Sequence, residues 1–408
     1  MKIYVSTNGC EEAQLSSMYV EQFFKENRQV IINDPAQADM LIFFACGLTA
    51  QTEKDSLLLI KKLKAVMKPA ARLVVWGCLG KINPRSLAAV YDGPLIGPAD
   101  TRFFERILEK TTFLFDEISA NSLSSRETSG FCDRNYTDLP TRVLMLPRKG
   151  MDKIRFKLGG SYERNPYFIR VATGCTGECV YCSERAAWGK IRSRPIDMVI
   201  SEFERGLKKG YKLFFLVAAD LGAYGIDKGF RLPDLFRKMI KSNDERDYKI
   251  ILNQINPFHL KELFCDLEET FSSGKIQLLC SPVQSGSNRI LKLMRRPYTA
   301  EEWRDYMIKM NKQFPSIRLK THFMVGFPTE TPEDFKATLK LLDYPLFLDS
   351  MGIFKFSVRP TVYAARMLGQ IPEEIKEARR KKLLRKYTYM YVLNLLLGRF
   401  RHQILSKP

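Results

Sequence analysis

The stretch Cys175-Thr-Gly-Glu-Cys179-Val-Tyr-Cys182 decides the fold of this chain. Its three cysteines have CxxxCxxC spacing, and the apolar run at residues 167–171 predicts a strand just before them. A glycine-containing loop of this kind can hold three irons of a cubane iron–sulfur cluster and leave the fourth iron open to a small molecule. The alternative is a zinc knuckle, which needs a fourth Cys or His close by, and none follows.

The composition is that of a globular protein, because 45% of the 408 residues are hydrophobic and 27% are charged. No apolar run is long enough to span a bilayer, so we expect a cytoplasmic protein without a membrane partner. Nine cysteines in that compartment should be reduced, which favours metal binding over disulfides. The net charge of +20 favours a polyanion such as RNA, or an acidic peptide, and does not choose between them.

Residues 1–111 alternate short apolar strands with amphipathic helices, which predicts an α/β domain with a small open parallel sheet. Cys10, Cys46 and Cys78 each follow one of the predicted strands. The carboxyl ends of parallel strands share one edge of a sheet, so these thiols should converge. We expect a second iron–sulfur cluster there, and the alternative is three buried core cysteines.

The rest of the chain predicts a linker, a second α/β domain and a terminal helix. Residues 112–163 contain Ser-, Pro- and Gly-bearing stretches, with one expected strand at 142–146. Residues 164–371 predict a partial (β/α)6 barrel whose site lies at the carboxyl ends of its strands. The expected barrel strands are 167–171, 212–217, 248–254, 275–279, 317–325 and 351–357.

Residues 372–408 form a helical extension with a dense basic run and then an almost wholly apolar segment. The run is either a surface for phosphate contacts or a solvated helix face that closes the barrel. Its basic residues are Lys376, Arg379, Arg380, Lys381, Lys382, Arg385 and Lys386.

Both cysteine sets and several later motifs resemble those of radical S-adenosylmethionine (SAM) methylthiotransferases, from residue 1 to about 386. The later stretches are 188–195, 220–227, 256–257, 282–287, 294–296 and 325–331. The resemblance implies two [4Fe-4S] clusters. One SAM would methylate a sulfur on the auxiliary cluster. A second SAM would give a radical that removes hydrogen from an unactivated C–H bond of the substrate. The substrate radical would then attack the methylated sulfur and leave with SCH3.

The resemblance also implies the residues of the site. Cys175, Cys179 and Cys182 would hold the catalytic cluster, and three dispersed cysteines would hold the auxiliary one: Cys10, Cys46 and Cys78. Candidates for contacts with SAM or substrate are Tyr181, Asp220, Tyr224, Gln284 and Ser285.

Four positions depart from the usual residues of that family. Ala13 and Phe44 replace Asn, His322 replaces Asp, and Thr329 replaces Gly. After residue 397 the chain is also too short for the RNA-binding TRAM barrel that members acting on tRNA carry. These departures leave the cluster cysteines intact and bear on the substrate.

Three functions therefore remain open. The first is methylthiolation of a tRNA adenosine next to the anticodon, which the motifs and the positive charge favour. The second is methylthiolation of a side-chain carbon in a protein or ribosomally made peptide, which the departures favour. The third is a non-catalytic iron–sulfur protein for redox sensing or electron transfer. For the enzyme we expect a monomer and a reducing partner such as flavodoxin or ferredoxin.

Overall fold

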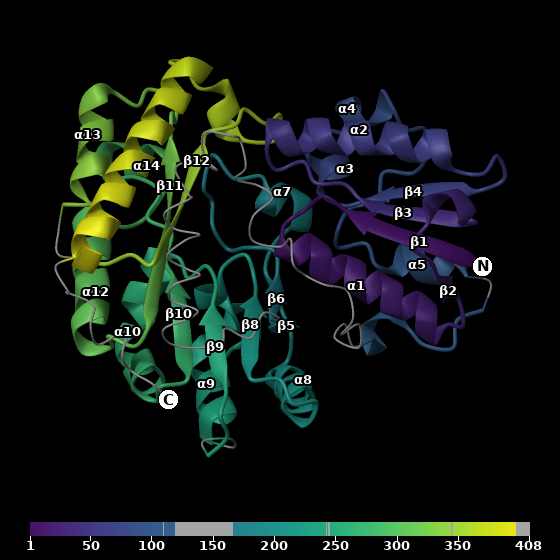
Figure 1. Ribbon diagram of the computed structural model, residues 1–408, viewed down its shortest axis with the longest axis horizontal. Coiled ribbons are helices and arrows are strands. Elements are labelled where there is room, and N and C mark those ends of the chain that lie inside the picture. Colours follow the sequence, from purple (N-terminus) through teal and green to yellow (C-terminus); the bar gives the residue numbers. More distant parts are fainter. Residues whose placement is uncertain (109, 119–165, 242, 244, 344–345, 397–408) are drawn as a thin grey trace.

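The computed structural model describes the chain except for residues 109, 119–165, 242, 244, 344–345 and 397–408. The expected strand at 142–146, and nearly all of the expected linker, lie outside the described residues. Two parallel sheets with their helices stand next to each other (Figure 1). No helix in the described part of the chain is both long and apolar enough to cross a membrane.

The first sheet has four parallel strands in the order β2-β1-β3-β4. Every residue of the central strand β3 is buried, because α1 and α5 pack on one face while α2 and α4 pack on the other. The strands are β1 (Lys2–Thr7), β2 (Val30–Ile31), β3 (Met40–Phe44) and β4 (Arg72–Trp76). The helices are α1 (Glu11–Glu26), η1 (Pro35–Gln37), α2 (Ala50–Val66), α3 (Cys78–Ile82), α4 (Pro84–Ala88), α5 (Arg102–Ile107) and η2 (Phe115–Glu117).

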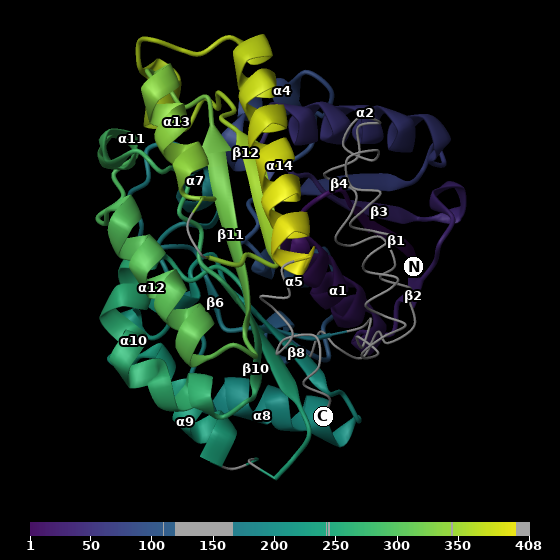
Figure 2. The ribbon, with the colours of Figure 1, turned by 60° about the vertical axis from the view of Figure 1, so that its left-hand side comes forward.

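The second sheet has six parallel strands in the order β12-β11-β10-β9-β8-β5, and this curved sheet confirms the expected open barrel. Helices α8, α9, α10, α12 and α13 cover its outer side (Figure 2). The strands are β5 (Tyr167–Arg170), β8 (Leu213–Val217), β9 (Lys249–Leu252), β10 (Ile276–Cys280), β11 (Arg318–Val325) and β12 (Ser350–Lys355). The helices are α8 (Ile196–Lys208), α9 (Leu232–Lys241), α10 (Pro257–Ser272), α12 (Ala300–Gln313), α13 (Pro332–Lys340) and α14 (Glu373–Leu396).

Several short elements near the cysteines were not expected. They are α7 (Glu184–Trp188), α11 (Asn288–Leu293), the antiparallel pair β6 (Ala172–Thr173) and β7 (Arg192–Ser193), and three single turns, η5 (Leu221–Ala223), η6 (Ile226–Lys228) and η7 (Tyr363–Arg366). The chain after β4 forms two short helices, α3 and α4, rather than one, because Pro84 starts a new helix at its first position. Beyond them, Ile96 joins the first sheet through a single bridge to Trp76.

The basic run of α14 is largely used inside the fold. The ammonium of Lys376 is buried and donates to the Phe356 carbonyl at 3.0 Å, and Arg379 pairs with buried Glu330 at 2.5 Å. Further pairs are Arg380–Glu377, Lys381–Glu377 and Lys386–Asp343. Lys376, Arg379 and Lys386 thus fasten the helix to the barrel, and two more of the seven basic residues pair within the helix, which favours the interpretation of a closing helix over a phosphate-binding surface.

Candidate active site

The loop that carries Cys175, Cys179 and Cys182 is shaped by backbone constraints. Gly174 adopts φ +70°, and a Cβ there would come 2.2 Å from the carbonyl oxygen of Lys190. Only glycine fits this left-handed position. The β6–β7 pair then brings the chain at residues 190–193 back against the start of the loop.

Each of the three loop sulfurs accepts one N–H donor. The Gly177 amide donates to Cys175 Sγ at 3.2 Å, and the Glu184 amide donates to Cys182 Sγ at 3.4 Å. The buried guanidinium of Arg296 donates to Cys179 Sγ at 3.4 Å. Hydrogen bonds of this kind stabilise thiolates and set the potential of a cluster bound to them.

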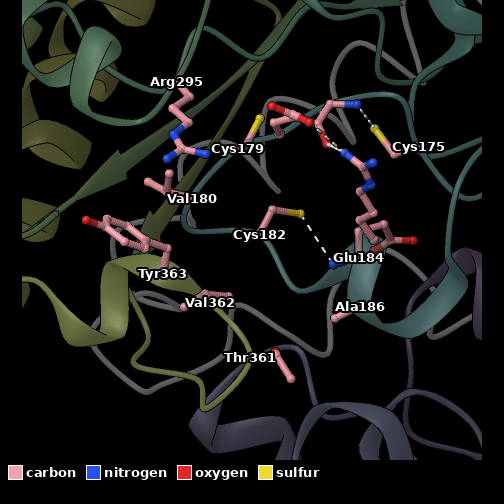
Figure 3. Close-up of a pocket in the computed structure, with 13 residues that line it drawn as sticks. Cys175, Cys179, Val180, Cys182, Glu184, Ala186, Arg295, Thr361, Val362 and Tyr363 are labelled. Atoms are coloured by element: carbon pink, nitrogen blue, oxygen red, sulfur yellow. Dashed lines mark hydrogen bonds and ion pairs between the residues drawn. The ribbon is translucent and has the colours of Figure 1, made fainter.

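The three cysteines line a cavity of about 430 Å³, with their side chains converging on it (Figure 3). Glu184 and Arg185, from the start of α7, line the same cavity. The remaining wall comes from the chain after β12, at residues 361–363, and from Arg295.

The second set, Cys10, Cys46 and Cys78, converges at the carboxyl edge of the first sheet. The register of β1, β3 and β4 aligns their ends, and each cysteine follows its strand by two or three residues. The side chain of Asn8 accepts from the Cys46 amide at 3.1 Å. A Cβ on Gly9 would lie 3.7 Å from the Cβ of Cys46, so the two loops are in contact.

Two departures from the expected family pattern have a packing explanation. A Cβ on Gly9 would lie 2.3 Å from the Cβ of Ala13, so the small side chain at 13 lets the Cys10 loop pack closely on α1. The Phe44 ring packs edge-on against Trp76, with ring centroids 4.7 Å apart, and lies below Gly77. A third departure, Thr329, adopts φ +65°, a strained conformation for a β-branched residue.

Glu184 lies between the two cysteine sets. Burial raises the pKa of Cys10 and Cys78 well above its usual range, and the Glu184 carboxylate raises it further. Burial and the same carboxylate also raise the pKa of Cys182. Burial, followed by repulsion from Glu12, raises the pKa of Glu184 itself to about 7. Thiols whose pKa is raised in this way become thiolates only beside a strong cationic centre. The cysteines of both sets therefore suit the ligands of a metal cluster.

Buried contacts join the two sheets on either side of the cysteines. Arg170 of β5 lies 2.6 Å from the Glu12 carboxylate of α1 and donates to Ser16 at 2.6 Å. Its guanidinium also lies over the rings of Tyr19 and Trp188, with centroid distances of 5.1 and 5.7 Å. A second contact is made by Arg359 with Glu53, and Ser357 accepts from the Ala50 amide at 2.9 Å.

Most of the other predicted site residues take part in internal networks. The carboxylate of Asp220 accepts from the amides of Gly222 and Asn256 and pairs with His259 at 2.9 Å. Tyr224 donates to the Arg194 carbonyl at 2.8 Å, and Ser285 contacts Thr338. Gln284 adopts φ +71° and bridges to β11, where its amide donates to the His322 carbonyl at 2.8 Å. Tyr181 is half-buried in an apolar cluster beside the cysteine loop. Direct contact of these residues with SAM or substrate stays a prediction.

Sequence reasoning missed Glu184, Arg296 and the contact between Arg170 and Glu12. The repeated Arg at 295–296 belongs to a stretch that carries the family resemblance, and this was the available signal for Arg296. No local pattern marks the other residues, because their role comes from the packing of one sheet on the other. Among the described residues, no group of three or more His, Cys, Asp or Glu is arranged around a single metal ion.

Comparison with known proteins agrees with this arrangement. Residues 169–342 match the Radical SAM superfamily, and residues 2–94 match the family described as Uncharacterized protein family UPF0004. A "Ribosomal protein uS12 methylthiotransferase RimO" from Carboxydothermus hydrogenoformans is 30% identical over 94% of this chain and 82% of its own length. A "Probable threonylcarbamoyladenosine tRNA methylthiotransferase" from Archaeoglobus fulgidus is 29% identical over 94% of this chain and 82% of its own length.

Among solved structures, the radical SAM methyltransferase TsrM from Kitasatospora setae has a similar fold, with a TM-score of 0.57. The match covers 89% of this chain and 77% of that one at 12% identity. The fold and the cysteine loop thus define a radical SAM enzyme, with SAM and a [4Fe-4S] cluster as its cofactors. More particularly, the chain belongs to the radical SAM methylthiotransferase family. The prediction of a transferase is confirmed, and the alternative of a non-catalytic iron–sulfur protein is excluded.

Proposed function

We propose that this enzyme transfers a methylthio group to an adenosine of tRNA next to the anticodon, and that it uses two [4Fe-4S] clusters. Cys175, Cys179 and Cys182 would hold the cluster that reduces SAM. The auxiliary cluster would be held by Cys10, Cys46 and Cys78. The observation that carries this proposal is the placement of both cysteine sets around Glu184. Glu184 begins α7, which packs against α3, the helix that begins at Cys78.

When bound, the clusters and SAM supply an organic radical and an activated sulfur. The chain itself must orient the substrate and keep water out of the space between the two sets. The contact of Arg170 with Glu12 fixes α1, which begins just after Cys10, relative to the strand that leads into the cysteine loop. We infer that this contact sets the spacing of the two centres.

The substrate assignment rests on two observations. The net charge of +20 favours a polyanion, and the A. fulgidus relative is named for its action on a tRNA adenosine. We further propose that the protein acts as a monomer with an acidic one-electron donor such as a flavodoxin or ferredoxin.

A second candidate is methylthiolation of a side-chain carbon in a protein. It is favoured by the ion pairs of α14, which leave only Lys382 and Arg385 of that basic run exposed and without a partner among the described residues. The relative named for ribosomal protein uS12 is as similar to this chain as the tRNA-named one.

The deciding experiment is mass spectrometry of tRNA nucleosides and of ribosomal proteins from cells with and without the gene. Loss of a methylthioadenosine from tRNA supports the first proposal. Loss of a methylthio group from a protein instead supports the second candidate. No change in either pool would refute both. The purified enzyme should contain about eight irons per chain, as two cubane clusters require.

A further inference from the structure

The inner face of the barrel presents an ammonium group that has no partner among the described residues. Along β11 the buried residues Leu319, Phe323 and Val325 pack into the core under the outer helices. The alternate residues Lys320 and His322 are half-buried, so they lie on the opposite face of the strand, toward the inside of the barrel.

The strand register places Lys320 at the mouth of the barrel. Lys320 pairs with Cys280, the last residue of β10. The preceding residue, Leu319, is level with Leu252, the last residue of β9. His322 stands two residues further along β11, beyond those ends. Ligands of such barrels bind at the carboxyl ends of the strands, so Lys320 faces the region where a substrate would enter.

Three other cations of the barrel are already neutralised. Each is an arginine that pairs with a buried or nearly buried carboxylate: Arg170 with Glu12, Arg194 with Glu202, and Arg318 with Asp349. Lys320 has no hydrogen bond or ion pair from its side chain to any residue in the described ranges. A partly buried charge without a partner is unfavourable, which makes this position suited to an anionic ligand.

The two polar side chains beside Lys320, those of Cys280 and His322, are uncharged. The Cys280 thiol lies 3.8 Å from Nε2 of His322. Burial, followed by the Lys320 ammonium, lowers the pKa of His322 to about 3, so the imidazole is a neutral donor or acceptor. Its ring packs edge-on against Phe354 at 5.2 Å. Together they form a polar corner with one positive charge. Burial, and after it the Glu11 carboxylate, raise the pKa of Cys280, so one acidic group acts on this corner, but it forms no ion pair with Lys320 in the described ranges.

We propose that Lys320, with His322 and Cys280 beside it, is a subsite for a carboxylate on the substrate. This rests on the proposed function: the target adenosine carries a substituent that ends in a carboxylate rather than an apolar one. SAM also carries a carboxylate, and the experiment below separates it from the carboxylate of the substituent.

The test is equilibrium binding of two labelled anticodon stem-loops, measured by fluorescence anisotropy. One carries threonylcarbamoyladenosine, which ends in a carboxylate, and the other carries the apolar dimethylallyladenosine. The change K320Q should weaken binding of the acidic loop by roughly 10- to 100-fold and leave the apolar loop nearly unaffected. K320R should retain most of the affinity. The matched control K340Q removes an exposed charge on α13, outside the barrel, and should affect both loops equally.

The alternatives give different results. Equal weakening of both loops by K320Q would mean a contact to the shared RNA backbone and would overturn the subsite. A rise in the KM for SAM, measured by deoxyadenosine formation without RNA, would assign Lys320 to the SAM carboxylate and would also overturn it. If the unaltered enzyme binds neither loop better than an unrelated hairpin, the tRNA function itself fails. If it binds them and K320Q changes nothing, only the subsite fails.

Discussion

Cys175, Cys179 and Cys182 reach one cavity from a single short loop, whereas Cys10, Cys46 and Cys78 are brought together by the register of three strands. In the first region, glycines and N–H donors within or near the loop shape the site. In the second, loops separated by more than thirty residues must pack correctly. The comparison teaches that a local site tolerates distant change, while a dispersed site depends on the whole sheet.

The largest expected effect comes from breaking the local site. Changing Cys175, Cys179 or Cys182 to Ala should reduce deoxyadenosine formation to background, because the open-iron cluster needs all three thiolates. Deoxyadenosine can be measured by mass spectrometry with dithionite as reductant. The control is C265A, an exposed cysteine on α10, which should behave as the unaltered enzyme. Turnover by the loop variants would contradict the assignment.

Breaking the dispersed site should separate the two halves of the reaction. Variants C10A, C46A and C78A should still cleave SAM but yield no methylthiolated product, and their iron content should fall by about half. Iron analysis and product mass spectrometry check this. Full product from any of these variants would show that the first sheet holds no cluster needed for sulfur transfer.

Loosening the contact between the regions should have an intermediate effect. In R170M the Glu12 carboxylate is left buried and unpaired, which should cost about 3–5 kcal/mol of unfolding free energy. More deoxyadenosine should form per methylthio group transferred, because the spacing of the two centres is no longer fixed. The control K64M breaks the exposed pair Lys64–Asp92 and should leave the free energy of unfolding nearly unchanged. If R170M and K64M form the same amount of deoxyadenosine per methylthio group transferred, Arg170 does not set the spacing of the two centres.

The smallest effect concerns pH. The pKa of His322 is lowered to about 3 by burial and by Lys320, whereas an unfolded histidine titrates near about 6.5. Below about pH 6.5 the unfolded chain binds a proton that the folded chain does not, so stability falls as pH is lowered, by at most about 1.4 kcal/mol per unit. Urea unfolding from pH 6.5 to 4 should show a shallower slope for H322N. M324L, on the same face of β11, should keep the original slope.

Much of this arrangement could be predicted from sequence because it follows local rules. Hydrophobic periodicity predicts the strand before Cys175 and the strands before the three dispersed cysteines, Cys10, Cys46 and Cys78. Their convergence follows because the carboxyl ends of parallel strands share one edge of a sheet. The contact of Arg170 with Glu12 could not be predicted, since it joins residues 158 positions apart. The short helix α7 was missed because five residues carry too little periodicity to stand out.

The helix α14 packs along β12, the last strand of an open sheet. A strand in that position presents unpaired amide and carbonyl groups that can recruit a strand from another molecule. Lys376 donates to the carbonyl of Phe356, just beyond the end of β12, and the helix covers this border. The ion pairs of α14 therefore protect the protein from self-association as well as stabilising its fold. If they are weakened, the protein should associate with itself before it unfolds.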